Sequence, residues 1–237
     1  MELPMRMPEP LIAAVLFDLD GTLIDSEPAY FESDRAFLAA YGIDYDAAMN
    51  ASFIGRSASE TMLVLERAFP DSPLNALPLA ERVRLKDAAF LDYAPSRVKP
   101  FAGVVALARR LAERGIAVAV ASGSSPEVID TMVQAMGLGN IFVHRVSATE
   151  VARGKPEPDV FLEAARRLNV PPASCLVVED SMHGVAAARA AGMACVALPT
   201  SGTSDLRDFA SAAIIVDGGA AALDPELVLR RFAWKGR

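Results

Sequence analysis

The chain has 237 residues, 52% of them hydrophobic, and a formal net charge of −7. This composition supports a packed core and excludes an intrinsically disordered chain. The negative charge argues against nucleic acid or an anionic membrane as the main partner. It does not exclude a small phosphorylated metabolite, because a binding site can be locally positive on an acidic protein. The length suits one large α/β domain, or a core domain with a smaller one.

Two cysteines, Cys175 and Cys195, lie in or beside apolar runs. Because no His or Cys stands near them at metal-ligand spacing, we expect core thiols in a reducing cytosol. Residues 1–10 contain no apolar stretch of signal-peptide length, and no run approaches the length of a membrane span. We therefore expect a cytoplasmic protein without a membrane partner, acting as a monomer or a weak homo-oligomer.

An apolar run at residues 11–17 leads directly into two acids, Asp18 and Asp20, and then Gly21. The run predicts a fully buried strand. The acids cannot stay in the core, so we expect them to emerge at the carboxyl end of the strand. In open α/β sheets that edge is where ligands bind.

The next segment, residues 27–94, shows helical periodicity and contains no β-branched apolar run. Helices are predicted from residue 27 to about 41, at about 44–51, from a capping box at 57–60, and at about 78–93. This segment is therefore predicted to be an all-helical insert.

After residue 95, short apolar runs alternate with helical segments. Strands are predicted at residues 116–121, 141–143, 175–178, 194–198 and 213–216, with helices between them and after the last. This alternation is typical of a doubly wound parallel sheet. We predict an α/β core domain of residues 1–26 and 97–237, with a helical cap domain of residues 27–96 inserted after the first strand.

Polar side chains follow several of these buried segments. Beside Asp18 and Asp20 there are Ser122 after the second strand, Lys155 in a Gly-Lys-Pro loop, and the pair Glu179–Asp180 after the fourth strand. Strand ends in a parallel sheet share one edge, so we expect these groups to meet. Clustered carboxylates repel one another, and a divalent cation relieves that repulsion. Oxygen ligands without His or Cys favour Mg²⁺.

The Asp-x-Asp spacing suits phosphoryl transfer. One ionised carboxylate can attack phosphorus and form an aspartyl phosphate. The second can protonate the leaving oxygen and later activate water. In an extended segment, residues i and i+2 point to the same side, so both acids can flank one phosphorus atom. Lys155 and a cation would stabilise the charge on the phosphoryl oxygens.

Four segments together resemble the motifs of the haloacid dehalogenase (HAD) superfamily: residues 18–28 (DLDGTLIDSEP), Ser122, residues 154–159 (GKPEPD) and residues 177–181 (VVEDS). The resemblance covers about residues 11–200. It is closest to the branch with a helical cap after the first motif, which includes β-phosphoglucomutase and many sugar-phosphate phosphatases. It implies a Rossmann-like core and a Mg²⁺-dependent reaction on a phosphate ester.

The resemblance also implies residue roles. Asp18 corresponds to the nucleophile and Asp20 to the general acid and base. The positions that correspond to metal ligands are Asp18, Asp20 (through its backbone carbonyl) and Asp180. Glu179 corresponds to a further ligand or to an ion-pair partner of Lys155. The positions that correspond to phosphate-binding residues are Ser122, Gly123 and Lys155. In the cap, Gly55–Arg56 resembles the loop that reads the leaving group, and Arg56 at a helix N-terminus is suited to an anion.

Some positions depart from the mutase pattern. Tyr30 stands where β-phosphoglucomutase has a histidine, and Ser125–Pro126 replaces Lys-Asn after the second motif. Both changes favour a phosphatase acting on a small phosphorylated metabolite, of which a sugar phosphate is the expected class. The alternatives are a phosphomutase of the β-phosphoglucomutase type, a non-enzymatic phospholigand-binding regulator, and a metal-dependent glycosyltransferase with an Asp-x-Asp motif.

Overall fold

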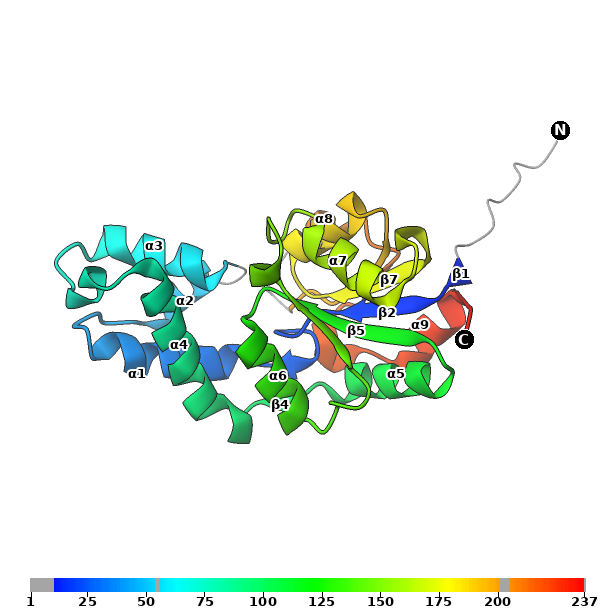
Figure 1. Cartoon of the computed structure of the whole chain (residues 1–237), viewed down its shortest axis with the longest axis horizontal. Helices are drawn as coiled ribbons and strands as arrows, with labels where there is room; N and C mark the ends of the chain where they lie inside the picture. Colours follow the sequence, from blue (N-terminus) through cyan, green and yellow to red (C-terminus); the bar gives the residue numbers. More distant parts are fainter. Residues whose placement is uncertain (1–10, 54–55, 201–204, 237) are drawn as a thin grey trace.

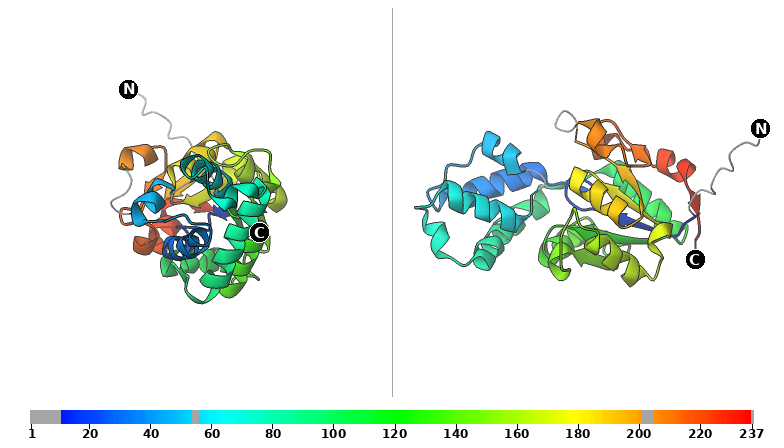
Figure 2. Two further views of the ribbon diagram at one scale, coloured as in Figure 1. Left: turned by 90° about the vertical axis from the view of Figure 1, so that its left-hand side faces the viewer. Right: turned by 90° about the horizontal axis from the view of Figure 1, so that it is seen from above.

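The computed structural model describes residues 11–53, 56–200 and 205–236. Four helices, α1 to α4, lie beside a larger body in which helices cover both faces of a parallel sheet (Figures 1 and 2). The predicted fold class, a doubly wound parallel sheet with a small helical cap inserted after the first strand, is confirmed.

The main sheet has six parallel strands in the order β6-β5-β2-β7-β8-β9. Their bounds are β2 Ala14–Phe17, β5 Ala117–Ser122, β6 His144–Ser147, β7 Cys175–Glu179, β8 Ala194–Ala197 and β9 Ile214–Ile215. The chain order reverses at β2, which pairs with β5 on one side and β7 on the other. Such a switch point opens a crevice at the carboxyl ends of the strands.

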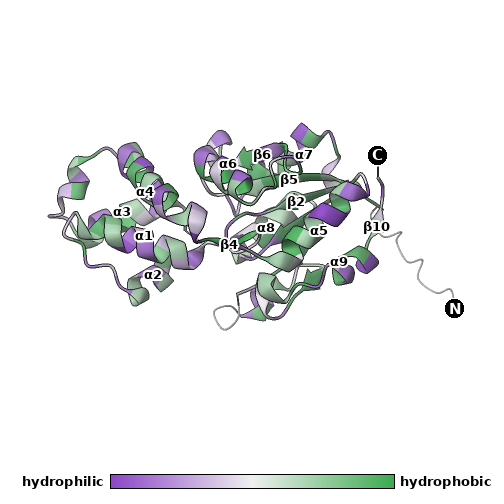
Figure 3. Ribbon diagram, turned by 90° about the horizontal axis from the view of Figure 1, so that it is seen from below, coloured by the Kyte–Doolittle hydropathy of each residue, from purple (hydrophilic) through white to green (hydrophobic). Residues whose placement is uncertain are grey.

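Side chains alternate across β2 and bury both faces of the sheet. Val15 and Phe17 pack with α5 (Ala102–Glu113), α6 (Pro126–Ala135) and α9 (Pro225–Arg231). Ala14 and Leu16 pack with α7 (Asp159–Leu168) and α8 (Met182–Ala190) on the opposite face. Figure 3 shows the hydrophobic character of β2 and β5. Two buried faces explain why the sequence of β2 is a continuous apolar run.

Two small ladders lie outside the main sheet. β1 (Leu11–Ile12) pairs with β10 (Ala233–Trp234) in parallel. β3 (Ile24–Asp25) pairs with β4 (Lys99–Pro100) in antiparallel orientation. The second ladder ties the segment that leaves for the four helices to the segment that returns from them.

The helical part consists of α1 (Glu27–Ala39), α2 (Ala47–Phe53), α3 (Ala58–Ala68) and α4 (Leu79–Tyr93). It has a hydrophobic cluster of its own, formed by Leu38, Ile43, Tyr45, Met62, Leu65 and Leu74. Ser57 and Glu60 form the predicted capping box at the start of α3. We propose residues 27–96 as the cap domain, and the separate core and the β3–β4 ladder support these limits.

Short 3₁₀ helices occupy several connections, at Pro73–Ala76, Ala94–Ser96, Ala148–Glu150, Pro172–Ser174, Leu206–Phe209 and Gly219–Ala222. The predicted strand at 141–143 is wrong. Phe142 lies in a turn, with its N–H bonded to the Leu138 carbonyl, and β6 begins at His144. The Phe142 ring instead packs edge-on against Phe17, with the ring centroids 5.5 Å apart. An apolar triplet that fills the core from a turn has the same sequence pattern as a short buried strand.

The two cysteines are buried free thiols, in β7 and β8, as the sequence predicts. Burial raises the pKa of the Cys175 thiol to about 12, so it stays protonated and unreactive. Among the helices of the described ranges, none combines the length and hydrophobicity needed to cross a membrane.

The separate core of the cap predicts different effects for two leucines of α3. Leu65 is 1% exposed, whereas Leu63 is 38% exposed. Leu65→Ala should lower the free energy of unfolding by about 2–5 kcal/mol, because it removes buried methyl groups and leaves a cavity. Leu63→Ala, the matched control, should change it by less than about 0.5 kcal/mol. Urea unfolding measures both values, and equal effects would contradict a separate cap core.

Candidate active site

Asp18 lies at the switch point of the sheet, directly after β2. Its N–H donates to the Val178 carbonyl of β7 over 3.0 Å, which carries the β2–β7 pairing one residue beyond β2. Its side chain is buried. The Lys155 Nζ donates to Asp18 Oδ1 over 2.5 Å. The structure therefore brings together two groups that are 137 residues apart in the sequence.

Lys155 reaches this position from the loop between β6 and α7. Its Nζ also donates to Glu179 Oε1 over 2.6 Å and to the Ala121 carbonyl over 3.2 Å, which accounts for all three protons of the ammonium group. Burial favours the neutral amine, but the charges of Asp18 and Glu179 outweigh it and raise the pKa of Lys155 above its ordinary value. Lys155 is therefore a fixed positive charge between two carboxylates.

Glu179, the last residue of β7, is held from two sides. Its Oε1 accepts from Lys155, and its Oε2 accepts from the N–H and the hydroxyl of Ser181, over 2.7 and 2.9 Å. Gly184 leaves the space that the carboxylate occupies, because a Cβ there would lie 1.9 Å from Oε1. Sequence reasoning missed Gly184. The available signal was a glycine in the first turn of a helix that Ser181 caps.

Asp180 faces the loop that follows Asp18. Gly21 has φ +74°, and a Cβ on it would lie 2.1 Å from Asp180 Oδ2. A glycine at this position therefore allows the loop to turn back against Asp180. Asp18, Glu179 and Asp180 each offer a carboxylate oxygen within 4.8 Å of the others. The predicted acidic cluster is thus assembled in space.

The electrostatics of this cluster fit a cation. Burial raises the pKa of Asp18 to about 7, with Lys155 opposing the shift and the charges of Glu179 and Asp20 adding to it. Burial, then the charges of Glu179 and Asp18, raise the pKa of Asp180 well above its ordinary value. One ammonium therefore does not offset the negative charge gathered here. An all-oxygen donor set with excess negative charge suits a hard divalent cation.

The two carboxylate oxygens of Asp20 differ in their hydrogen bonding. Its Oδ2 accepts from the Ser124 hydroxyl over 2.5 Å. Its Oδ1 is buried and has no hydrogen-bond partner within the described part of the chain. Burial raises the pKa of Asp20, while hydrogen bonds from Ser124 and Ser26 oppose the shift. Sequence reasoning did not assign Ser124 to the site, because a serine just before a helix also suits an N-cap, a position that Ser125 takes in the structure.

The predicted phosphate-binding segment lies at the end of β5. Ser122 is buried, and its Oγ accepts from the Ser124 N–H over 3.1 Å. Gly123 is exposed, with open space where a side chain would start. β5 pairs with β2, so this segment reaches the same sheet edge as Asp18. Phosphate binding by these two residues stays a prediction.

The cap contributes Arg56, an exposed residue, while Gly55 lies outside the described residues. The Arg56 Nε donates to the Ser52 carbonyl over 3.2 Å, so one of its donors is engaged. Hydrogen bonds from Ser57 lower the pKa of Glu60, and the charges of Arg56 and of His183 in the core lower it further. An electrostatic interaction between Glu60 and His183 thus connects the start of α3 with the start of α8. The role of Arg56 in reading a leaving group stays a prediction.

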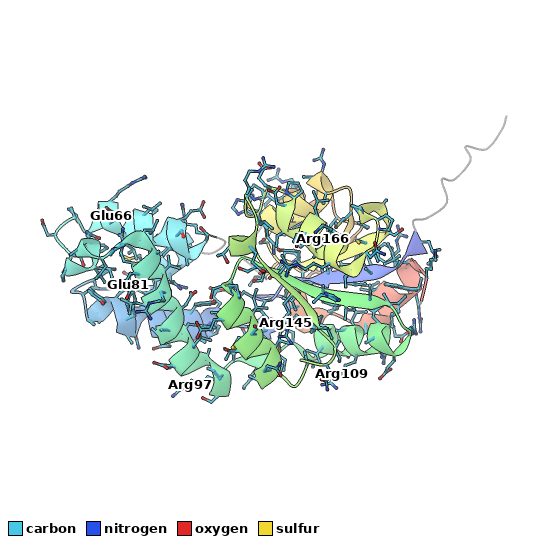
Figure 4. The ribbon with its side chains drawn as sticks, in the orientation of Figure 1. Glu66, Glu81, Arg97, Arg109, Arg145 and Arg166 are labelled. Carbon is cyan, nitrogen blue, oxygen red and sulfur yellow. The ribbon has the colours of Figure 1, made fainter. Side chains whose placement is uncertain are left out.

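Other cations of the core and its border lie away from this edge. Arg97, Arg109 and Arg166 are exposed on the outer surface (Figure 4). Arg166 pairs there with Glu163. Lys155, by contrast, is placed by the fold to touch Asp18.

Residues 12–192 match the family model of the haloacid dehalogenase-like hydrolases. The chain belongs to this family. The family and the capped branch predicted from the four motifs are confirmed. The matched residues include both the helical insert and the strands that carry the site.

Three HAD proteins illustrate the similarity. Fructose-1-phosphate phosphatase YqaB of Escherichia coli is 35% identical over 185 residues, which are 76% of this chain and 93% of that protein. A bifunctional riboflavin kinase/FMN phosphatase of Arabidopsis thaliana is 35% identical over 80% of this chain, which spans about half (49%) of its length. The crystal structure of CbbY from Rhodobacter sphaeroides with phosphate has a TM-score of 0.79 at 28% identity, covering 90% of this chain and 96% of that one.

The fit of Gly184 against Glu179 predicts the effect of one added methyl group. Gly184→Ala should lower the free energy of unfolding by about 1–3 kcal/mol, because the new Cβ displaces a buried carboxylate. Met182→Ala in the same turn of α8 is the matched control, since Met182 is exposed, and it should change stability by less than about 0.5 kcal/mol. Thermal unfolding tests both. A Gly184→Ala variant as stable as the wild type would mean that Glu179 is not fixed.

Proposed function

We propose that the chain is a Mg²⁺-dependent phosphatase that hydrolyses a small phosphorylated metabolite, of the sugar phosphate class, through an aspartyl phosphate on Asp18. One observation carries this proposal. Asp18 lies at the switch point against Lys155, and Asp20, two residues later, keeps one carboxylate oxygen that no described residue hydrogen-bonds. The enzyme class, a phosphoric monoester hydrolase, has the support of the phosphatases to which the chain is similar.

Asp18 is the nucleophile in this proposal. The ammonium of Lys155 favours its ionised form and fixes its orientation. An oxygen of Asp18 attacks phosphorus, the bond from phosphorus to the ester oxygen breaks, and the phosphoryl group becomes bonded to Asp18. Glu179 acts indirectly, because its contacts with Lys155 and Ser181 hold the ammonium in place.

Asp20 moves the proton. It gives a proton to the ester oxygen that leaves, and the alcohol departs. It then takes a proton from the water that attacks the phosphorus of the aspartyl phosphate, which releases inorganic phosphate and restores Asp18. Ser122 and the N–H of Gly123 are proposed to bind the phosphoryl oxygens through hydrogen bonds.

Asp18, Asp180 and the backbone carbonyl of Asp20 are the proposed ligands of Mg²⁺. Both oxygens of Glu179 are already engaged by Lys155 and Ser181, so we assign Glu179 to orienting Lys155 rather than to the metal. When bound, Mg²⁺ supplies positive charge that neutralises the phosphoryl oxygens.

Specificity is proposed to come from the cap. Arg56 and Glu60 lie at the start of α3, and Glu60 interacts electrostatically with His183 of α8. The β3–β4 ladder joins the cap to the core at the position where a hinge is needed. A sugar phosphate as the substrate class is supported by YqaB, which is a fructose-1-phosphate phosphatase.

The test is a screen of phosphate release over a panel of phosphorylated metabolites, with Mg²⁺ and with a chelator. The wild type should release phosphate only with the metal. Asp18→Asn should reduce the rate by at least about 10³-fold, because the amide is not a nucleophile. Asp217→Asn is the matched control, since Asp217 is exposed on the core surface, and it should keep the wild-type rate.

Chromatography of the organic product separates the alternatives in the same experiment. An isomeric sugar phosphate formed without free phosphate would identify a phosphomutase. Phosphate release that persists at the wild-type rate in Asp18→Asn would contradict the mechanism. Binding of phosphorylated ligands without any turnover would support a regulator.

A further inference from the structure

We propose that Ser124 and Tyr30 are positioning residues for Asp20, and that together they connect its carboxylate to the cap. Contact between the cap and the core then adds a second hydroxyl to the group that holds Asp20 in its working orientation. This inference rests on the proposed function, because it concerns the residue that transfers the proton.

Two hydroxyl groups form the connection. The Ser124 Oγ donates to Asp20 Oδ2 over 2.5 Å, and the Tyr30 hydroxyl lies 3.4 Å from the same Ser124 Oγ. A serine hydroxyl has one proton. Because Ser124 gives that proton to the carboxylate, Tyr30 is the donor in the second contact. The chain of hydrogen bonds runs from Tyr30 in α1 through Ser124 to Asp20.

The core side of this connection is rigid. The Ser124 N–H donates to Ser122 Oγ over 3.1 Å, and the Ser124 carbonyl accepts from the Ser147 hydroxyl over 2.6 Å. Ser122 and Ser147 are the last residues of β5 and β6, and both are buried. The backbone of Ser124 is therefore attached to the sheet and does not follow the cap.

The cap side is equally well held. The Tyr30 ring stacks on Phe90 of α4, with centroids 3.8 Å apart and an angle of 13°. The Lys86 Nζ of α4 lies 4.4 Å from the centroid of the Tyr30 ring and 3.1 Å from Asp34 Oδ1, one turn further along α1. Lys86 and Asp34 are both buried. Tyr30 therefore moves together with α1 and α4.

In this series of hydrogen bonds, the contact between the two hydroxyls is the one that depends on the position of the cap. A separation of 3.4 Å is near the outer limit for an O–H···O hydrogen bond, so a small movement of the cap makes or breaks it. Without the Tyr30 hydroxyl, the Ser124 oxygen loses the donor from which it accepts, and only its own hydrogen bond to Asp20 orients it. Asp20 Oδ1 has no partner in the described ranges, so the hydrogen bonds from Ser124 and Ser26 fix the carboxylate plane.

Steady-state kinetics on the best substrate of the panel test the inference. Tyr30→Phe keeps the aromatic stack and removes the hydroxyl, and it should lower kcat about 5-fold. Ser124→Ala should lower kcat at least about 10-fold, because it removes the direct hydrogen bond to the acid. KM should stay within about twofold, and both variants should remain folded, since neither removes a buried apolar group. Tyr30→Phe should have no further effect on kcat in the Ser124→Ala background, because both residues act through the same series of hydrogen bonds.

Tyr93→Phe is the matched control. Tyr93 lies at the end of α4 with Arg97 over its ring, and this variant should keep the wild-type kcat. A wild-type kcat in Tyr30→Phe, a change confined to KM, or independent effects in the double variant would each overturn the inference. These outcomes leave the proposed function intact as long as Asp18→Asn stays inactive. An active Asp18→Asn would instead overturn the proposed function.

Discussion

The site depends on one ammonium group shared by two buried carboxylates. Lys155 forms ion pairs with Asp18 and Glu179 at the sheet edge where β2 and β7 end. Neither carboxylate is stable there alone, because burial disfavours an isolated charge. The position of Lys155 determines the orientation of Asp18, and the excess of carboxylates around it creates the demand for a metal. The proposed nucleophile and the proposed metal site both depend on this one electrostatic constraint.

The surrounding backbone is shaped to permit this arrangement. Gly21 and Gly184 stand where a side chain would collide with Asp180 and with Glu179. Both glycines allow close approach between a loop or helix and a carboxylate that the sheet fixes. The cap is added through the β3–β4 ladder, next to the loop that carries Asp20. The proposed mechanism therefore places attack and metal binding in the core, and proton transfer where the core meets the proposed cap.

The sequence predicts the sheet, the helical insert and the acidic cluster because each follows from a local pattern: apolar runs, helical spacing and acids directly after a strand. It also predicts that Lys155 meets these acids, since parallel strands end at one edge. It does not predict the contact between Ser124 and Tyr30, which are 94 residues apart, with Tyr30 in the proposed cap. The prediction of a strand at 141–143 was wrong because the hydrophobic side chain of Phe142 packs into the core from a turn. Patterns show what must be buried, whereas packing decides how it is buried.

The central claim is that the phosphoryl group passes through Asp18. The most direct measurement is mass spectrometry of peptides from enzyme that is quenched with acid during turnover. The account predicts that one phosphoryl group is bonded to Asp18 in the peptide that contains Asp18 and Asp20, and that it disappears when the substrate is exhausted. A phosphoryl group on a different residue, or turnover in which no residue is ever phosphorylated, would contradict it.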